Sequence, residues 1–457
     1  MSGRISLNAF QIATPCQHTS GAWRNPRSRA AEGYTDLEYW TGLAQTLERG
    51  KFDSLFLADV LGVYDVYGGS PDAAIRGAAQ VPILDPFTLI SAMAAVTSRL
   101  GFAVTAATTY EQPYALARRF SSLDHLTKGR IGFNVVTSYL ESAARNLGLD
   151  AQLDHDLRYD MGDEFMEVVY KLWEASWEDD AVLADRESGV FADPSKVHPI
   201  GHEGEHYRVP GIHLTAPSPQ RTPVIFQAGA SSRGTAFAAR HGEGVFINGM
   251  RKDIAARIVG SLRDAAEQAG RPRDALRVMQ QITVIVGDSD AQAERLHREA
   301  ISYATPEASL ALYGGWSGVD MSGFAPDQVL EYVDTNSMRS TLALLTTADP
   351  EKRKWTTSDL VEFMRIGGVG PVIVGGPETV ADEIEDWVET AGLDGINLFH
   401  AVSPETYEQF VELVVPELQK RGRVWDDYAG STLREYYYGE GRQRVRDDHP
   451  AAAHRRR

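Results

Sequence analysis

The chain has 457 residues, with 45 basic and 63 acidic side chains and a formal net charge of −18 at pH 7. A composition that is 43% hydrophobic and 24% charged is typical of a globular protein and excludes a largely disordered chain. The acidic balance argues against broad binding to nucleic acid or to an anionic membrane, because both require a basic surface.

Cysteine and hydropathy patterns point to a cytoplasmic location. The single cysteine, Cys16, excludes an intrachain disulfide and a multi-cysteine metal site. Such a composition suits a reducing compartment, and the first residues lack the pattern of a signal peptide. No run approaches the roughly 20 apolar residues of a membrane helix. We therefore expect a cytoplasmic protein without a membrane span, and we interpret Cys16 as a buried small residue rather than a nucleophile.

The first half of the chain alternates apolar runs with amphipathic stretches. Short apolar runs predict buried strands at 5–12, 54–60, 101–108 and 130–137. Apolar residues at three- and four-residue spacing predict helices at 34–50, 85–100 and 114–129. Buried strands separated by helices favour a parallel sheet with its outer face covered.

The same alternation continues to the end of the chain. Further helices are predicted at 158–177, 231–242, 253–269, 377–392 and 404–422. Further strands are predicted at 222–230, 244–249, 278–287 and 395–401. A count near eight strand–helix units predicts an α/β fold, a (β/α)8 TIM barrel formed by 1–457 as a single domain.

The excess length lies in two irregular stretches, at about 181–222 and 303–371. We expect both to be insertions at the C-terminal face of the barrel, and the second is a candidate lid. The basic segment 442–457 is expected to be a solvated tail. The nearby sequence TLREYYYGEG fits either a subunit interface or packing within the chain.

Two motifs that suggest common enzyme classes do not fit those classes. HEGEH, from His202 to His206, matches the zinc-protease signature, which requires a helix. Glycine and proline surround it, so we predict a turn between two short strands and no metal site. The glycines of 368–376 lack the spacing of a dinucleotide-binding turn.

The strongest local signal is an apolar strand that runs into the sequence AGASSRG and then into a helix. Free N–H groups at a helix N-terminus, with a close backbone approach and hydroxyl groups, suit a phosphate. The residues concerned are Ala228, Gly229, Ser231 and Ser232. The alternative is an ordinary turn in which Ser231 or Ser232 caps the helix.

Polar residues also close several predicted strands at their carboxyl ends. Asp59, Thr108, Asn134 and Ser138 all lie at or just after such ends. In a barrel, this rim is where binding and catalytic residues collect. Each residue alone is equally consistent with a cap or a satisfied core group, but together they indicate a ligand with a flat, hydrogen-bonding face.

Long ordered blocks of the sequence resemble the bacterial luciferase-like monooxygenases. The resemblance is to the branch with nitrilotriacetate, dibenzothiophene-sulfone, long-chain alkane and dimethyl sulfide monooxygenases. It spans almost the whole chain, and its carriers are GAWRNP (21–26), 47–74, 117–138, HDLRYD (155–160), VFADPSKVH (190–198) and 218–234.

The resemblance implies an enzyme that uses reduced FMN from a separate NAD(P)H-dependent flavin reductase. Oxygen would add to the flavin to give a peroxyflavin, which oxygenates a small-molecule substrate. By position, Asp59, Thr108, Asn134 and Ser138 would line the flavin ring. Tyr159, with Gly229, Ser231 and Ser232 beside Ala228, would hold the phosphate end. The relatives also imply a homodimer or homotetramer.

The substrate side departs from the alkane enzyme. Thr14 replaces a cysteine, while Tyr139 and Leu312 replace histidines. We therefore favour a small apolar or organosulfur substrate, with C–S cleavage as one outcome. The catalytic candidates on the substrate side are His18, Tyr64, Gln80, Tyr139 and His400, and a core role without chemistry is open for each.

Three alternative functions stay open at this point. The first is an alkane hydroxylase of the same branch. The second is a deazaflavin-dependent dehydrogenase of the superfamily, which moves hydride and uses no oxygen. The third is a barrel that binds flavin without turnover. Oxygen consumption with reduced FMN separates the leading hypothesis from the last two.

Overall fold

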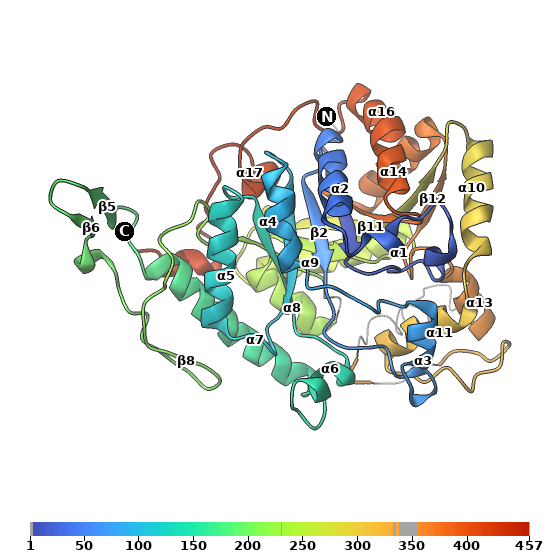
Figure 1. Cartoon of the computed structure of the whole chain (residues 1–457), viewed down its shortest axis with the longest axis horizontal. Coiled ribbons are helices and arrows are strands. Elements are labelled where there is room, and N and C mark those ends of the chain that lie inside the picture. Colours follow the sequence, from blue (N-terminus) through green and yellow to red (C-terminus); the bar gives the residue numbers. More distant parts are fainter. Residues whose placement is uncertain (1–2, 230, 332–334, 338–353, 457) are drawn as a thin grey trace.

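A closed barrel of eight parallel strands forms the centre of the molecule (Figure 1). The structure, a computed structural model, describes residues 3–229, 231–331, 335–337 and 354–456. Pairing of β1 with β13 and of β10 with β11 closes the ring, which confirms the predicted (β/α)8 TIM barrel. In ring order the strands are β1 (Ser6–Ile12), β2 (Ser54–Ala58), β3 (Gly101–Ala107), β4 (Ile131–Val136), β9 (Val224–Gln227), β10 (Gly244–Ile247), β11 (Arg277–Val286) and β13 (Gly395–His400).

Amphipathic helices surround the barrel and cover the outer side of its strands (Figure 1). In α2, for example, Asp36 caps the first turn by accepting from the Glu38 N–H, and the buried residues Trp40, Leu43 and Leu47 share one face. The surrounding helices are α2 (Leu37–Arg49), α4 (Phe87–Ala95), α5 (Pro113–Leu126), α7 (His155–Tyr170), α8 (Ser232–His241), α9 (Lys252–Gln268), α10 (Asp290–Ser302), α14 (Pro377–Ala391), α15 (Glu405–Gln409) and α16 (Val415–Lys420).

Shorter elements connect these units. The π-helical turns η3 (Lys171–Ala175) and η6 (Phe410–Val414) extend α7 and join α15 to α16. The remaining helices are α1 (Ala30–Gly33), α3 (Asp72–Gly77), α6 (Glu141–Asn146), α11 (Pro306–Ser317), α13 (Thr357–Phe363) and α17 (Leu433–Tyr438), with 3-10 turns η1 (Ala22–Arg24), η2 (Tyr67–Gly69), η4 (Pro194–Lys196), η5 (Arg273–Ala275) and η7 (Pro450–His454). Every described helix is too short or too polar to cross a membrane.

At the end where the strands begin, the barrel interior is packed with aromatic rings and is closed by α17. Phe226 stacks on Phe246 with ring centroids 5.3 Å apart, and the edge of Phe56 meets Phe246 at 4.4 Å. Leu433 and Tyr437 of α17 belong to the same buried cluster. TLREYYYGEG therefore packs within the chain, at the end of the barrel where the strands begin, and this resolves the alternative left by the sequence.

A ninth strand, β12 (Val372–Gly375), was not among the predicted elements. The strand β11 pairs with β10 over its first residues, and its last four residues, Thr283–Val286, pair with β12. The glycine-rich sequence 368–376, which lacks a dinucleotide-binding pattern, thus contains a strand that extends the barrel wall.

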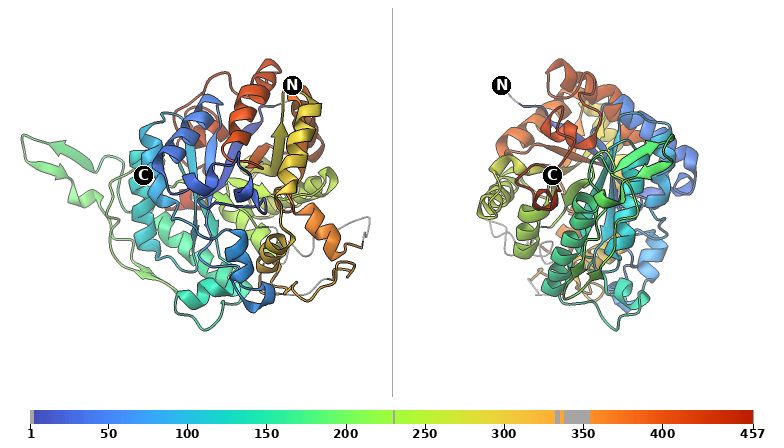
Figure 2. Two further views of the ribbon diagram at one scale, coloured as in Figure 1. Left: turned by 45° about the vertical axis from the view of Figure 1, so that its right-hand side comes forward. Right: turned by 90° about the vertical axis from the view of Figure 1, so that its left-hand side faces the viewer.

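The two long insertions take different positions. The stretch 181–222 connects η3 to β9, and its hairpin of β5 (Val182–Asp185) and β6 (Val190–Ala192) projects away from the barrel (Figure 2). A second hairpin, β7 (His202–Glu203) with β8 (Arg208–Val209), packs against α7 through Glu164. The stretch 303–371 brings α11 against α3 and η2, which follow β2. The predicted lid falls partly on 332–334 and 338–353, which lie outside the described residues.

The expectation of a solvated C-terminal tail is wrong. Val445, His449 and Ala451 are buried, and Arg444 pairs with the buried Glu174 at 3.0 Å. The His449 ring contacts the carbonyl of His241 at 2.8 Å. The basic sequence of the tail does not reveal that residues far away in the chain provide acidic partners and apolar contacts for it.

Candidate active site

The HEGEH sequence forms a hairpin turn, as predicted, and not a metal-binding helix. Glu164 on α7 accepts from the backbone N–H groups of His206 and Tyr207 at 2.9 and 2.8 Å, and it contacts His202 Nε2 at 3.1 Å. The part of the chain that the structure describes contains no group of three metal-ligating side chains. The motif therefore anchors an insertion to the barrel.

The predicted phosphate site lies at the N-terminus of α8, directly after β9. Ser231 caps the helix by accepting from the Gly234 N–H at 3.0 Å, whereas Ser232 is the first helical residue. The Tyr159 hydroxyl faces the same turn: a Cβ atom on Gly234 would lie 2.8 Å from it and one on Gly229 would lie 3.1 Å from it. The glycines thus leave room beside two hydroxyl groups and the free N–H groups of a first helical turn.

The N–H group of Gly229 is not one of the free donors. It donates to Gln227 Oε1 at 2.8 Å, so the contribution of Gly229 is space rather than a hydrogen bond. A Cβ atom at this position would also overlap Gln227 Nε2. Ala228 precedes this turn, and Ala230, between Gly229 and Ser231, lies outside the described residues.

Three of the predicted flavin-ring residues lie on β4 or just beyond the ends of β3 and β4. Asn134 Nδ2 donates to Thr105 at 2.9 Å, and its Oδ1 atom is buried with no partner in the described structure. Thr108 donates to the Val136 carbonyl at 3.3 Å. Ser138 has a left-handed backbone, with φ of 59°, and its carbonyl accepts from Arg158. The unpaired Asn134 oxygen is therefore available to accept a hydrogen bond from a ligand.

Asp59 lies directly after β2 and carries a strongly perturbed carboxyl group. Burial raises its pKa to about 7, and the nearby carboxylate of Asp85 acts in the same direction, while the Val60 N–H opposes them. A carboxyl group that titrates near neutral pH at the carboxyl end of a barrel strand is a functional-site candidate.

Tyr64, Gln80 and Tyr139, all predicted for the substrate side, form one hydrogen-bonded group. The Tyr64 hydroxyl donates to Gln80 Oε1 at 2.9 Å and lies 2.7 Å from the Tyr139 hydroxyl. Trp316 of α11 donates to Tyr64 at 3.3 Å. Burial raises the pKa of Tyr64 to about 12 and that of Tyr139 well above its usual range, so both are neutral.

His18 and His400 lie close together beside this group. The His18 ring stacks with Phe399 at 5.1 Å and meets the edge of Trp316 at 5.1 Å, while its Nδ1 atom has no partner among the described residues. Gln17 Nε2 contacts His400 Nδ1 at 3.0 Å. Burial lowers the pKa of each histidine to about 3, so both rings are neutral at physiological pH.

Trp316 is the main residue of this region that the sequence did not single out. It lies in the insertion that follows α10, and the sequence GGW at 314–316 was its only signal. A Cβ atom on Gly315 would overlap the ring of Tyr64, so the glycine lets α11 pack directly on that ring. Leu312, on the same helix, is buried in the same apolar cluster as Tyr64.

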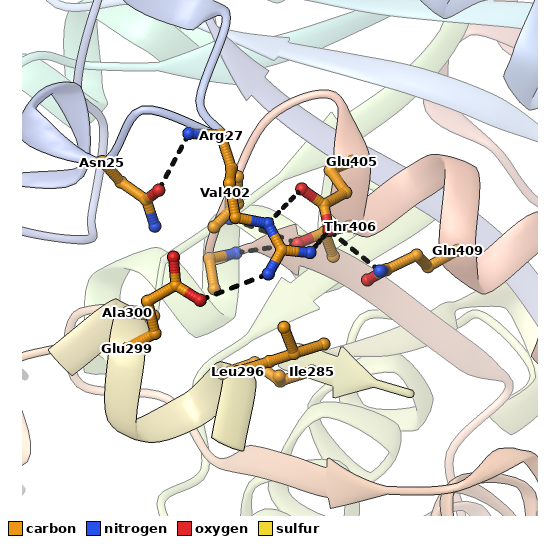
Figure 3. A pocket seen from close by; sticks show the side chains of 11 residues that line it. Asn25, Arg27, Ile285, Leu296, Glu299, Ala300, Val402, Glu405, Thr406 and Gln409 are labelled. Carbon is orange, nitrogen blue, oxygen red and sulfur yellow. Dashed lines mark hydrogen bonds and ion pairs between the residues drawn. The ribbon is translucent and has the colours of Figure 1, made fainter. Parts of the chain in front are cut away.

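A separate hollow at the carboxyl ends of β11 and β13 has a different character (Figure 3). Arg27 lies in it between two carboxylates, donating to Glu405 at 2.9 Å and to Glu299 at 3.3 Å. The charged groups there are paired with one another within the protein. The groups around Gln80, His18 and Asn134, in contrast, retain unpaired polar atoms.

The family model described as luciferase-like monooxygenase matches residues 13–395 of this sequence. The chain belongs to the luciferase-like monooxygenases. It is therefore an oxidoreductase that incorporates oxygen from O2, and enzymes of this branch of the family are flavin-dependent.

Individual relatives match over the whole chain. A dimethyl-sulfide monooxygenase from Hyphomicrobium sulfonivorans is 56% identical, with 100% of this chain and 94% of that protein covered. A long-chain alkane monooxygenase from Geobacillus thermodenitrificans is 48% identical, with 100% and 99% covered. The crystal structure of a riboflavin lyase with modified FMN and riboflavin superposes with a TM-score of 0.92 at 38% identity, covering 99% of this chain and 100% of that one.

Proposed function

We propose that this luciferase-like monooxygenase binds reduced FMN and oxygenates a small neutral organosulfur compound. The observation that carries the cofactor assignment is the turn between β9 and α8, where the Tyr159 and Ser231 hydroxyls meet a helix N-terminus and two glycines leave space. A phosphate monoester fits such a donor set, because the free N–H groups and hydroxyls all donate to anionic oxygens.

The residues around the strand ends suit the flavin ring. Asn134 offers an unpaired acceptor for a ring N–H, and Thr108, Ser138 and Asp59 surround the same rim. When bound, reduced FMN supplies the electrons that split O2, so that one atom enters the substrate and the other leaves as water. The protein contributes orientation and a dry site: α11 places Trp316 against Tyr64 and His18.

The substrate assignment rests on the side chains near Gln80. Tyr64, Tyr139, His18 and His400 are neutral, and they lie with apolar side chains such as Leu312. Such an environment favours neutral molecules over polycarboxylates, because a buried anion without a cation is costly. The 56% identity to a dimethyl-sulfide monooxygenase supports an organosulfur substrate, and C–S cleavage after oxygenation of the adjacent carbon is part of the proposal.

The remaining parts of the proposal concern partners. We expect a separate NAD(P)H-dependent flavin reductase to supply reduced FMN, in the cytoplasm, and we expect a homodimer or homotetramer. The name of a 35% identical relative, nitrilotriacetate monooxygenase component A, supports a two-component system.

The decisive experiment combines the chain with a flavin reductase, NADH, FMN and oxygen-18 gas. A dialkyl sulfide, a dialkyl sulfone and an n-alkane are offered in parallel, and the products are analysed by mass spectrometry. We expect one labelled oxygen atom in the product of a sulfur compound. Label incorporation into the alkane alone would favour the alkane hydroxylase, and an absence of substrate-dependent products under air would overturn the proposal.

A binding experiment tests the cofactor site independently of turnover. Anaerobic titration with reduced FMN is expected to show weaker binding to Ser231→Ala and Asn134→Leu than to the parent. Equal affinities in both variants would contradict the assigned site. Reduction of a deazaflavin by a secondary alcohol, without oxygen uptake, would instead favour the dehydrogenase.

A further inference from the structure

Hydrogen bonds run from Tyr139 to Tyr64 and on to the side-chain amide of Gln80, whose N–H groups have no acceptor among the described residues. Tyr64 has one hydroxyl proton and donates it to Gln80 Oε1 at 2.9 Å. The proton in the 2.7 Å contact between the two tyrosine hydroxyls therefore comes from Tyr139. Gln80 is 2% exposed, and its Nε2 atom has no partner in the described part of the structure.

The direction of this chain is fixed by its members. Rotating the Gln80 amide by half a turn would make Nε2 the donor to Tyr64, and Tyr64 would then donate to Tyr139. The Tyr139 proton would then have no acceptor among the described residues, and neither would the amide oxygen, so two groups would be unsatisfied instead of one. Trp316, which donates to the Tyr64 oxygen, is compatible with both directions and adds rigidity.

The surroundings of the free amide group are neutral and largely apolar. Trp316 and Leu312 of α11 are buried in one cluster with Tyr64, and Tyr139 packs against it. His18, which also has an unpaired atom, stacks against the adjacent rings of Phe10 and Phe399. A ligand bound here meets a hydrogen-bond donor in an aromatic environment, and such a site rejects an analogue that lacks the matching acceptor.

We propose that Tyr139 and Tyr64 orient Gln80 so that its amide N–H binds the oxygen of a sulfoxide or sulfone group. This inference rests on the proposed function and narrows its substrate class to small neutral S-oxygenated compounds. Tyr139 acts as a positioning residue, since it touches Tyr64 and reaches the substrate through Gln80. The departure from histidine at this position thereby supplies a single, fixed proton donor in place of a titratable ring.

Two ligands of similar size test the proposal without flavin or turnover. Thiolane 1-oxide carries the S=O acceptor on a five-membered ring, and methylcyclopentane replaces that group by a methyl group. Dissociation constants are measured by ligand-observed NMR on the full chain. We expect the sulfoxide to bind about tenfold more tightly, a ratio that corresponds to about 1.4 kcal/mol. Equal affinities, or tighter binding of the hydrocarbon, would overturn the proposal.

Variants then locate the donor. Gln80→Met keeps the side-chain length and removes the N–H group, so the affinity ratio should fall to about one. Tyr139→Phe leaves Gln80 in place but releases its orientation, and the ratio should fall about threefold. General damage to the site would weaken both ligands together and leave the ratio unchanged, so the ratio separates positioning from a merely structural role.

Ser218→Ala is the control, because Ser218 is also buried but precedes β9, at the end of the barrel where the strands begin. The ratio should be unaffected in this variant. If Ser218→Ala abolishes the preference and Gln80→Met retains it, the assignment to Gln80 is wrong.

Failure of this inference is distinguishable from failure of the proposed function. Labelled oxygen entering a thioether, together with equal binding of the two probe ligands, would retain the monooxygenase and reject the role of Gln80. Preferential sulfoxide binding without any oxygenated product would reject the organosulfur monooxygenase while retaining the donor site. If Gln80→Met instead weakens reduced FMN and leaves the sulfoxide ratio intact, the amide serves the flavin and the proposal is overturned.

Discussion

Two groups of polar side chains at opposite ends of the barrel, those of α17 and those around Gln80, differ in whether their buried atoms are hydrogen-bonded. At the end where strands begin, Arg434 of α17 donates to Glu243 at 2.7 and 2.9 Å, and all three tyrosines of this helix hydrogen-bond through their hydroxyl groups. At the end where strands finish, Gln80, His18 and Asn134 each keep an unpaired buried atom. A satisfied network stabilises the fold, whereas leftover donors and acceptors are free to bind a ligand.

The largest effect is expected from removing the buried ion pair of Arg434 and Glu243, at the end where the strands begin. Arg434→Met leaves the buried Glu243 carboxylate without its cation, and removing one partner of a buried pair costs about 3–5 kcal/mol. Urea unfolding should show this loss, and Arg442→Met, at an exposed position, should change stability by less than about 0.5 kcal/mol. If Arg434→Met had the same free energy of unfolding as the parent, the bonded group at this end of the barrel would not contribute to stability as proposed.

The next effect concerns the proposed phosphate site, at the end of the barrel where the strands finish. Gly229→Ala places a Cβ atom against Gln227 and 3.1 Å from the Tyr159 hydroxyl, in the space assigned to a phosphate. Affinity for reduced FMN should fall at least about tenfold, or about 1.4 kcal/mol. Calorimetric titration under anaerobic conditions measures it.

The matched control is Gly260→Ala in α9, where a Cβ atom meets nothing within 4 Å. This change should stabilise the helix by about 0.5–1 kcal/mol and leave flavin affinity unchanged. Equal flavin affinity in both alanine variants would show that the turn after β9 is not the phosphate site.

A pH-dependent effect of intermediate size is expected at Asp59. Its folded-state pKa of about 7 lies above the ordinary value of 3.8, so between pH 4 and 7 the folded protein holds a proton that the unfolded chain has lost. Stability contributed by this group is therefore present at low pH and declines as pH rises through 7. Melting temperatures of Asp59→Asn should lack this component of the pH profile.

Asp85 provides the control for that profile. Its carboxylate contributes to the raised pKa of Asp59, and it caps α4 by accepting from the Phe87 N–H at 2.9 Å. Asp85→Asn keeps a capping oxygen and removes the charge, so the transition should move to lower pH without disappearing. An unchanged profile in Asp59→Asn would assign the transition to another group.

The smallest expected effect is that of metal removal. Because Glu164 engages His202 and the turn of the HEGEH hairpin, chelators should alter neither the melting temperature nor the rate of substrate oxygenation. Activity assays after dialysis against EDTA, compared with buffer alone, test this expectation. Loss of activity that zinc restores would contradict it.

The sequence predicted the barrel well because eight of its strands are apolar runs flanked by amphipathic helices. It failed for β12, since four residues between glycines carry no periodicity, and for the tail, since the partners of Arg444 and His449 lie far away in sequence. The grouping of Tyr64, Gln80 and Tyr139 was predicted through the family resemblance. Trp316 was missed because its contact with Tyr64 spans 252 residues of sequence.

The shared edge of β11 has a practical consequence for engineering. This strand is ten residues long, and its last four residues depend on β12, which directly follows the late insertion. A shortened enzyme that lost β12 along with that insertion would expose the hydrogen-bonding edge of Thr283–Val286, and an apolar edge of this kind recruits other chains. Internal deletions within the insertion that leave Val372 and the rest of β12 in place should therefore remain monodisperse. Deletions that also remove β12 should aggregate.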